Sequence, residues 1–264
     1  MTIPSDETSR WRSFVALGDS FTEGMCDDVQ SDGRQIGWAD RTAQGLAETQ
    51  SSSVNYANLA VRGRLISQVA SEQVPAALAL DPDLVSVAAG VNDVMRRHFS
   101  VDATATALES CVRQIRRAGS DPLIFSFGNP ARRAGMMSLV AGRMAAYRSA
   151  TLAIAATYDA YVVDFWDVAA FDDDSQWDAD RLHLSPLGHQ RASWAALNAL
   201  GLADDLWRTP GVPSPRPGLT QRVSSHATWA AGYAAPWLAR RVKGTSSGDG
   251  IEPKGAEYRT VHPL

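Results

Sequence analysis

Short apolar runs alternate with longer alanine-rich stretches over the first 200 residues, and this alternation constrains the fold more than any other feature. The short runs are rich in β-branched residues and span residues 13–17, 53–58, 84–89, 123–127 and 161–165. The longer stretches have apolar residues at helical spacing and span residues 38–48, 65–80, 101–118, 139–158 and 186–200. Continuous apolar strands, each followed by a helix, predict a five-stranded parallel sheet covered on both faces: a three-layer α/β/α domain.

The chain changes character after this domain, which we expect to occupy residues 1–208. Residues 209–220 contain four prolines, and the aromatic and basic residues that follow predict a proline-rich strap and a short helical segment up to residue 243. Residues 244–264 are rich in glycine, serine and charge, so we expect a disordered tail there.

Charge is distributed unevenly along the chain. Residues 1–208 carry 18 arginines and no lysine against 26 acidic residues, whereas residues 209–264 carry seven basic residues against three acidic ones. An acidic chain lacks the basic footprint that nucleic acids require, so we expect no nucleic-acid partner. We expect the aromatic and basic segment up to residue 243 to dock onto the acidic domain and residues 244–264 to be dispensable. The alternative is a weak association of that segment of the tail with an anionic membrane.

Several features predict a reduced, cytoplasmic protein. No stretch is long and apolar enough for an integral membrane segment. The first 12 residues carry four charges and no apolar run, so we expect no signal peptide. Two cysteines, Cys26 and Cys111, are too few for a disulfide framework or a thiolate metal site, and we expect free thiols without a role.

The first loop whose residues could take part in catalysis is Gly18-Asp19-Ser20-Phe21. In parallel sheets, functional residues collect on loops that leave the carboxyl ends of the strands, and this loop follows the first strand. Ser20 is placed as an exposed nucleophile, and its N–H at a helix start points to where an oxyanion would develop. An ordinary helix cap is the alternative. The G-x-S-x-G elbow of ordinary α/β-hydrolases is missing here.

A serine nucleophile needs a base, and His183 is the candidate among five histidines. Asp180 lies three residues earlier and can curl back to hold the Nδ1–H of the imidazole, which leaves Nε2 to accept the serine proton. The segment follows the fifth strand, so it belongs to the same edge of the sheet. A solvated histidine in a surface loop is the alternative.

Two further loops supply candidate oxyanion donors. Gly63 follows the second strand and offers an unobstructed N–H, and Asn92 follows the third strand and offers a side-chain amide. Together with the Ser20 N–H they would form an oxyanion hole, in which each donor contributes roughly 3–4 kcal/mol. Taken singly, Gly63 could be a turn glycine and Asn92 a helix cap.

Other residues near these loops are candidates for substrate binding. Trp177 precedes the His183 segment and could wall an acyl pocket, as could Met136 and Met137 after the fourth strand. Packing in the core is the alternative for all three. Residues 172–174 form an acidic run that we interpret as a solvated turn, so we expect no metal site.

These blocks together resemble the four motif blocks of the SGNH (GDSL) hydrolase family. They are Gly18-Asp19-Ser20-Phe21, Gly63 within residues 58–64, Gly90-Val91-Asn92-Asp93 and Asp180-x-x-His183, in the family's order. The resemblance covers residues 13–200 and implies a flavodoxin-like sheet of order 2-1-3-4-5. It also implies ester hydrolysis through Ser20, His183 and Asp180, with Gly63 and Asn92 in the oxyanion hole. Phe21 stands where the family often has leucine.

We therefore expect a serine hydrolase that cleaves a small-molecule or lipid carboxylic ester through an acyl-enzyme, without a cofactor. An acyltransferase that uses the same triad is the first alternative. The second is a non-catalytic flavodoxin-like binding module, although the loop after Gly18 lacks the glycine-rich phosphate fingerprint.

Overall fold

Six strands form one sheet in the computed structural model, which describes residues 10–132, 136–211 and 247–264. The strand order is β5-β4-β3-β1-β2-β6, with bounds β1 (Ser13–Gly18), β2 (Val54–Asn58), β3 (Leu84–Ala88), β4 (Asp121–Ser126), β5 (Tyr161–Asp164) and β6 (Gly255–Val261). The pairs among β1 to β5 are all parallel, which confirms the predicted order 2-1-3-4-5. The predicted strand count was one too low.

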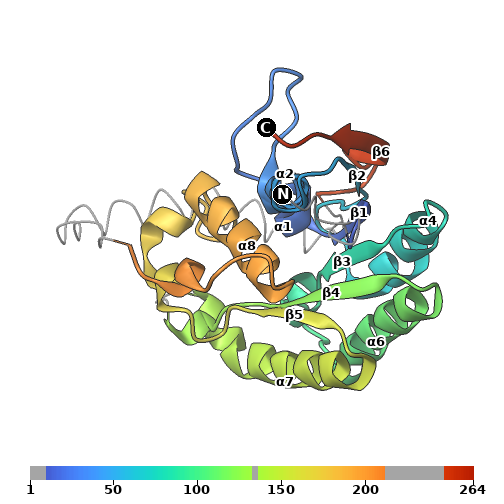
Figure 1. Ribbon diagram of the computed structural model, residues 1–264. Coiled ribbons are helices and arrows are strands. Elements are labelled where there is room, and N and C mark those ends of the chain that lie inside the picture. Colours follow the sequence, from blue (N-terminus) through green and yellow to red (C-terminus); the bar gives the residue numbers. More distant parts are fainter. Residues whose placement is uncertain (1–9, 133–135, 212–246) are drawn as a thin grey trace.

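Helices cover both faces of the sheet. α2 (Gly37–Gln50) and α8 (Pro186–Ala199) pack on one face, and α6 (Val101–Arg117) and α7 (Ala141–Tyr158) pack on the other (Figure 1). The shorter helices are α1 (Ser20–Glu23), α3 (Ile66–Gln68), α4 (Val74–Leu78) and α5 (Val91–Val94). The 3-10 helices are Pro130–Arg132, Met136–Val140, Ala169–Asp172, Asp174–Gln176 and Leu206–Arg208. The three-layer α/β/α fold is thereby confirmed.

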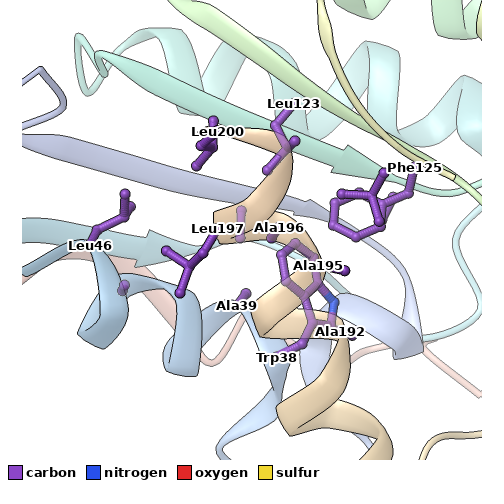
Figure 2. Packing of buried hydrophobic residues seen from close by; sticks show 14 of the residues in the cluster. Trp38, Ala39, Leu46, Leu123, Phe125, Ala192, Ala195, Ala196, Leu197 and Leu200 are labelled. Atoms are coloured by element: carbon purple, nitrogen blue, oxygen red, sulfur yellow. The ribbon is translucent and has the colours of Figure 1, made fainter. Parts of the chain in front are cut away.

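The face under α2 and α8 depends on small residues. Alanines of α8 lie against α2 and β4, where Trp38 of α2 meets Phe125 of β4 with ring centroids 4.5 Å apart (Figure 2). A Cβ at Gly45 would lie only 2.5 Å from Cδ1 of Leu197, so the two helices approach closely. Small side chains thus let both helices lie close to each other and to the sheet.

The helix predicted over residues 65–80 is interrupted. α3 passes into a π-helical turn, Val69–Gln73, and α4 follows it. Pro75 at the start of α4 has no N–H to donate, so the ladder of i to i−4 hydrogen bonds cannot run through it. The turn also directs Gln73 into the core, where its side-chain amide bonds to both the N–H and the carbonyl of Gly18 at 2.8 and 2.9 Å. This pair of bonds fixes the end of β1.

The prediction that residues 244–264 are disordered is wrong for residues 247–264, the part of this tail that the structure describes. β6 pairs antiparallel with β2, with Val54 opposite Val261 and Asn58 opposite Gly255. Two of the tail's charges are paired with the domain, because Lys254 and Arg259 both bond to Asp40 of α2. These ion pairs add to the backbone pairing with β2, and composition alone indicates neither contact.

Some predictions lie outside the described residues. The predicted strap and helical segment of residues 209–243 lie almost entirely outside the described residues, and so do Trp229, Tyr233 and Trp237. The prediction of weak membrane association concerns the same segment. The side chain of Met136 is also outside them. Among the helices of the described ranges, none combines the length and apolar character needed to cross a membrane.

Candidate active site

Ser20 begins α1, directly beyond the carboxyl end of β1. The turn before it requires glycine: Gly18 has φ +149°, and a Cβ there would lie 2.3 Å from the carbonyl oxygen of Ala88 on β3. The Asp19 side chain caps α1 by accepting the N–H of Phe21 at 3.1 Å. The strand end, the tight turn and the cap together direct the Ser20 hydroxyl to the edge of the sheet.

Three side chains form a continuous hydrogen-bonded chain at this edge. His183 Nε2 lies 2.8 Å from Ser20 Oγ, and His183 Nδ1 lies 2.5 Å from Asp180 Oδ2. The other carboxylate oxygen of Asp180 accepts the N–H groups of Leu182 and His183, each at 2.9 Å. With the proton on Nδ1, the imidazole donates to Asp180 and can accept the serine proton at Nε2. The structure thus brings the three predicted catalytic residues together.

The loop that carries this pair is closed at its base. Trp177 and Leu184 form an isolated bridge, and the Asp178 N–H donates to the His183 carbonyl at 2.9 Å. Burial raises the pKa of Asp180, but the hydrogen bond from His183 and the charge of His183 together bring this pKa below its usual value. Asp180 therefore remains a carboxylate next to the imidazole.

Asn92 lies in α5, close to the start of α1. Its Nδ2 donates to Asp19 Oδ2 at 2.9 Å and to the carbonyl of Arg64 at 3.2 Å. Burial raises the pKa of Asp19 to about 7, against 3.8 for an ordinary aspartate. Both amide hydrogens of Asn92 have acceptors in the protein, so one of them must be exchanged if Asn92 is to donate to a substrate oxygen.

Gly63 lies in the loop after β2, with φ +76°. This loop is tied to the active-site turn, because the Val61 N–H donates to the Gly18 carbonyl at 3.3 Å and Asn58 Nδ2 donates to the Thr22 carbonyl at 2.9 Å. Among the described residues, none accepts a hydrogen bond from the N–H of Gly63 or of Ser20. Both N–H groups therefore remain candidates for oxyanion donors.

Cys26 is a residue near this site that sequence reasoning gave no role. Its Sγ lies within 4.8 Å of ligand atoms of Asp180 and His183. Burial, together with the charges of Asp180 and Asp178, raises the pKa of the Cys26 thiol to about 12, so it stays protonated. A thiol, a carboxylate and an imidazole are side-chain types that bind metal ions, but here Asp180 and His183 are hydrogen-bonded to each other. Nothing in the local sequence marks Cys26, because only the fold brings it to the triad.

Of the predicted pocket residues, Trp177 and Met137 do not line the hollow beside α1. This hollow has about 400 Å³ and is lined by the apolar side chains of Met25 and Val29, by Gly33, and by five polar or charged side chains: Glu23, Arg34, Gln35, Arg62 and Lys254. Trp177 instead packs on Phe171 and donates its indole N–H to the Phe171 carbonyl at 2.8 Å. Met137 is half-buried in a 3-10 helix.

The fold and these side chains have the arrangement of a serine hydrolase: a parallel α/β sheet with Ser20, His183 and Asp180 hydrogen-bonded in series at the carboxyl edge. The chain belongs to the GDSL-like lipase/acylhydrolase family, whose model matches residues 16–191. Family membership makes it a carboxylic ester hydrolase.

Solved structures with the same fold are distant in sequence. LAE5, an alpha/beta hydrolase from the metagenome of Lake Arreo, is 20% identical with a TM-score of 0.61, over 73% of this chain and 96% of LAE5. Axe2, an acetylxylan esterase from Geobacillus stearothermophilus, is 19% identical with a TM-score of 0.60, over 74% of this chain and 97% of Axe2. The esterase EstA from Pseudoalteromonas sp. is 16% identical with a TM-score of 0.57, over 72% of this chain and 97% of EstA. No curated protein matches the sequence.

Proposed function

We propose that the protein hydrolyses carboxylic esters in two steps through an acyl-enzyme on Ser20. The observation that carries this proposal is the chain of hydrogen bonds from Asp180 through His183 to Ser20 Oγ. It gives the serine a base in reach and gives the base an orienting carboxylate.

In the first step Ser20 Oγ attacks the ester carbonyl while its proton passes to His183 Nε2. The tetrahedral adduct collapses, the bond to the alcohol oxygen breaks, and the alcohol leaves with the proton from His183. Asp180 stabilises the imidazolium that exists between these events. Water then attacks the acyl-enzyme in the same way, which releases the acid and restores Ser20.

The carbonyl oxygen gains negative charge in both adducts, and we propose that three donors bind it. These are the N–H groups of Ser20 and Gly63 and the side-chain amide of Asn92. For Asn92 this requires that its hydrogen bond to the Arg64 carbonyl be given up as the oxyanion forms. Donors that meet the oxygen only when it is charged lower the barrier by roughly 3–4 kcal/mol each.

The substrate class we propose is a small ester with a polar part. The hollow beside α1 is lined mainly by polar and charged side chains, and Axe2, which shares the fold, is an acetylxylan esterase. An acyl group on a hydroxylated alcohol suits such walls better than a long apolar chain does.

Turnover of p-nitrophenyl acetate by Ser20→Ala tests the proposal. We expect turnover to fall to near background with the far-UV spectrum unchanged, whereas Ser149→Ala, a control on the exposed face of α7, should keep full activity. Retention of wild-type turnover by Ser20→Ala would refute the role of Ser20. Faster release of the alcohol product when a second alcohol is added would instead favour an acyltransferase.

A further inference from the structure

Two contacts from opposite directions meet at Arg62, the residue before Gly63. The first comes from Glu23 at the end of α1. Glu23 Oε2 accepts the backbone N–H of Arg62 at 2.7 Å, and Glu23 Oε1 accepts Nε of the same arginine at 2.9 Å. The two side chains are only 11% and 31% exposed, so water screens this pair weakly.

The second contact comes from Gly248, far along the chain. A Cβ at this position would lie 2.0 Å from the carbonyl oxygen of Arg62 and 3.0 Å from Cγ1 of Val61. Gly248 is not among the glycines with positive φ, so its lack of a side chain serves close approach rather than an unusual turn. The backbone of the C-terminal segment is therefore seated directly against the loop that carries Gly63.

The C-terminal segment is itself fixed to the domain. The Lys254 ammonium donates to the carbonyls of Gln35 and Ile36 at 2.8 and 2.6 Å and to Asp40 Oδ2 at 2.7 Å. Just beyond it, Gly255 pairs with Asn58, the last residue of β2 before the Gly63 loop; β6 lies beside β2 at the edge of the sheet (Figure 1). All three N–H donors of the Lys254 ammonium have acceptors, so the position of this side chain is fixed.

We propose that residues 247–261 are a positioning element of the oxyanion hole. Glu23 holds the Arg62 N–H from one side and Gly248 abuts the Arg62 carbonyl from the other, which sets the position of the Gly63 N–H. The inference rests on the proposed role of Gly63 as an oxyanion donor. Oxyanion donors act through preorganisation, so a small displacement of this peptide reduces catalysis without removing any catalytic group. The segment lies outside residues 16–191, the part of the chain that the family model matches.

Gly248→Ala tests this inference against Gly142→Ala in α7, since Gly142 has no positive φ and a Cβ there meets no atom within 4 Å. We expect Gly248→Ala to lower kcat by about 10-fold per active site and to leave KM within about twofold. Active sites are counted by fluorophosphonate titration, which removes any effect of a misfolded fraction. The inhibition constant of phenylboronic acid, whose serine adduct places an oxygen in the hole, should weaken by a similar factor. Equal kcat and boronate affinity in the two variants would overturn the inference.

Glu23→Gln provides a second test that adds no atom to the packed contact. Its matched control is Glu72→Gln, because Glu72 pairs with the neighbouring Arg64 at 3.1 Å but is 49% exposed. We expect Glu23→Gln alone to lower kcat and boronate affinity together. If Glu23→Gln behaves like Glu72→Gln, the inference is wrong, whether or not Gly248→Ala folds. If Ser20→Ala retains activity, the proposed function fails instead, so the two failures are distinguishable.

Discussion

The Asp19 carboxyl is buried beside the proposed nucleophile, and this burial raises its pKa to about 7. Its protonation adds stability that is fully present below the unfolded value of 3.8 and is lost as the pH rises through about 7. Asp19→Asn keeps an acceptor for the Phe21 N–H and cannot ionise. The wild-type protein should lose stability relative to Asp19→Asn as Asp19 ionises. We therefore expect the unfolding free energy of the variant minus that of the wild type to be about 3 kcal/mol larger at about pH 8 than at about pH 5. Urea denaturation at both pH values measures it, and a gain independent of pH would contradict the raised pKa.

His189 is a buried neutral histidine that shifts stability in the opposite direction. Its Nδ1 accepts the Trp38 N–H at 3.2 Å and its Nε2 donates to the Met25 carbonyl at 2.9 Å. Burial lowers the pKa of His189 to about 4, so the stability it contributes is present above 6.5 and is lost as the pH falls toward 4.

We expect this histidine to cost about 2 kcal/mol of unfolding free energy between about pH 7 and about pH 5. In His189→Gln this part of the pH dependence should disappear, although the variant is less stable at neutral pH. Urea midpoints and slopes at the two pH values decide the matter. An unchanged pH dependence in His189→Gln would show that other groups cause the loss.

At the residue scale, the sequence predicted the hydrogen-bonded chain of Ser20, His183 and Asp180 better than its surroundings. Ser20, His183 and Asp180 were found because each sits in a short local pattern after a strand. Glu23 and Cys26 were missed, since their relation to the site exists only after loops distant in sequence have been brought together. The second acceptor for the Asn92 amide, the Arg64 carbonyl, was missed for the same reason.

At the element scale, the C-terminal strand is held by its pairing with β2 and by ion pairs with Asp40. Lys254 and Arg259 are its two cationic partners, and the Asp40 side chain is only 7% exposed. Lys254→Met should lower the unfolding free energy by about 3 kcal/mol, because it leaves a buried carboxylate short of its main partner. Arg132→Gln, which breaks an exposed pair with Asp172, should change it by less than about 1 kcal/mol.

Urea denaturation of these two variants measures the difference directly. Comparable small losses in both would mean that Lys254 is not an anchor for the strand. Removal of residues 247–264 should then also leave the melting temperature unchanged, whereas we expect it to fall.

Local patterns identified five strands and the long helices because both faces of this sheet are buried and each helix has one apolar face. They failed for β6, in which only the last residue, Val261, is buried. Such a strand depends on the free edge of β2 and on Asp40, and neither can be read from residues 255–261. The break near Pro75 could have been predicted from the proline, but the inward turn of Gln73 could not.

At the scale of the whole molecule, the active site draws on loops from the entire length of the domain. The turn after β1, the loops after β2 and β3 and the loop before α8 converge because parallel strands end at one edge. The C-terminal segment then returns across that edge and contacts the loop after β2. The docking predicted from charge for residues 209–243 lies outside the described residues. The basic residues that do bind the acidic domain are Lys254 and Arg259, in the part that composition predicted to be disordered.

Labelling with a fluorophosphonate tests most directly whether Ser20 is a nucleophile activated by His183, since such reagents phosphonylate only activated serines. Peptide mapping should place one adduct on Ser20 in the wild-type protein. His183→Ala should label at least about 100-fold more slowly, because the base is gone while Ser20 remains. An adduct on another residue, an equal rate in His183→Ala, or no adduct in a folded wild-type protein would contradict the account.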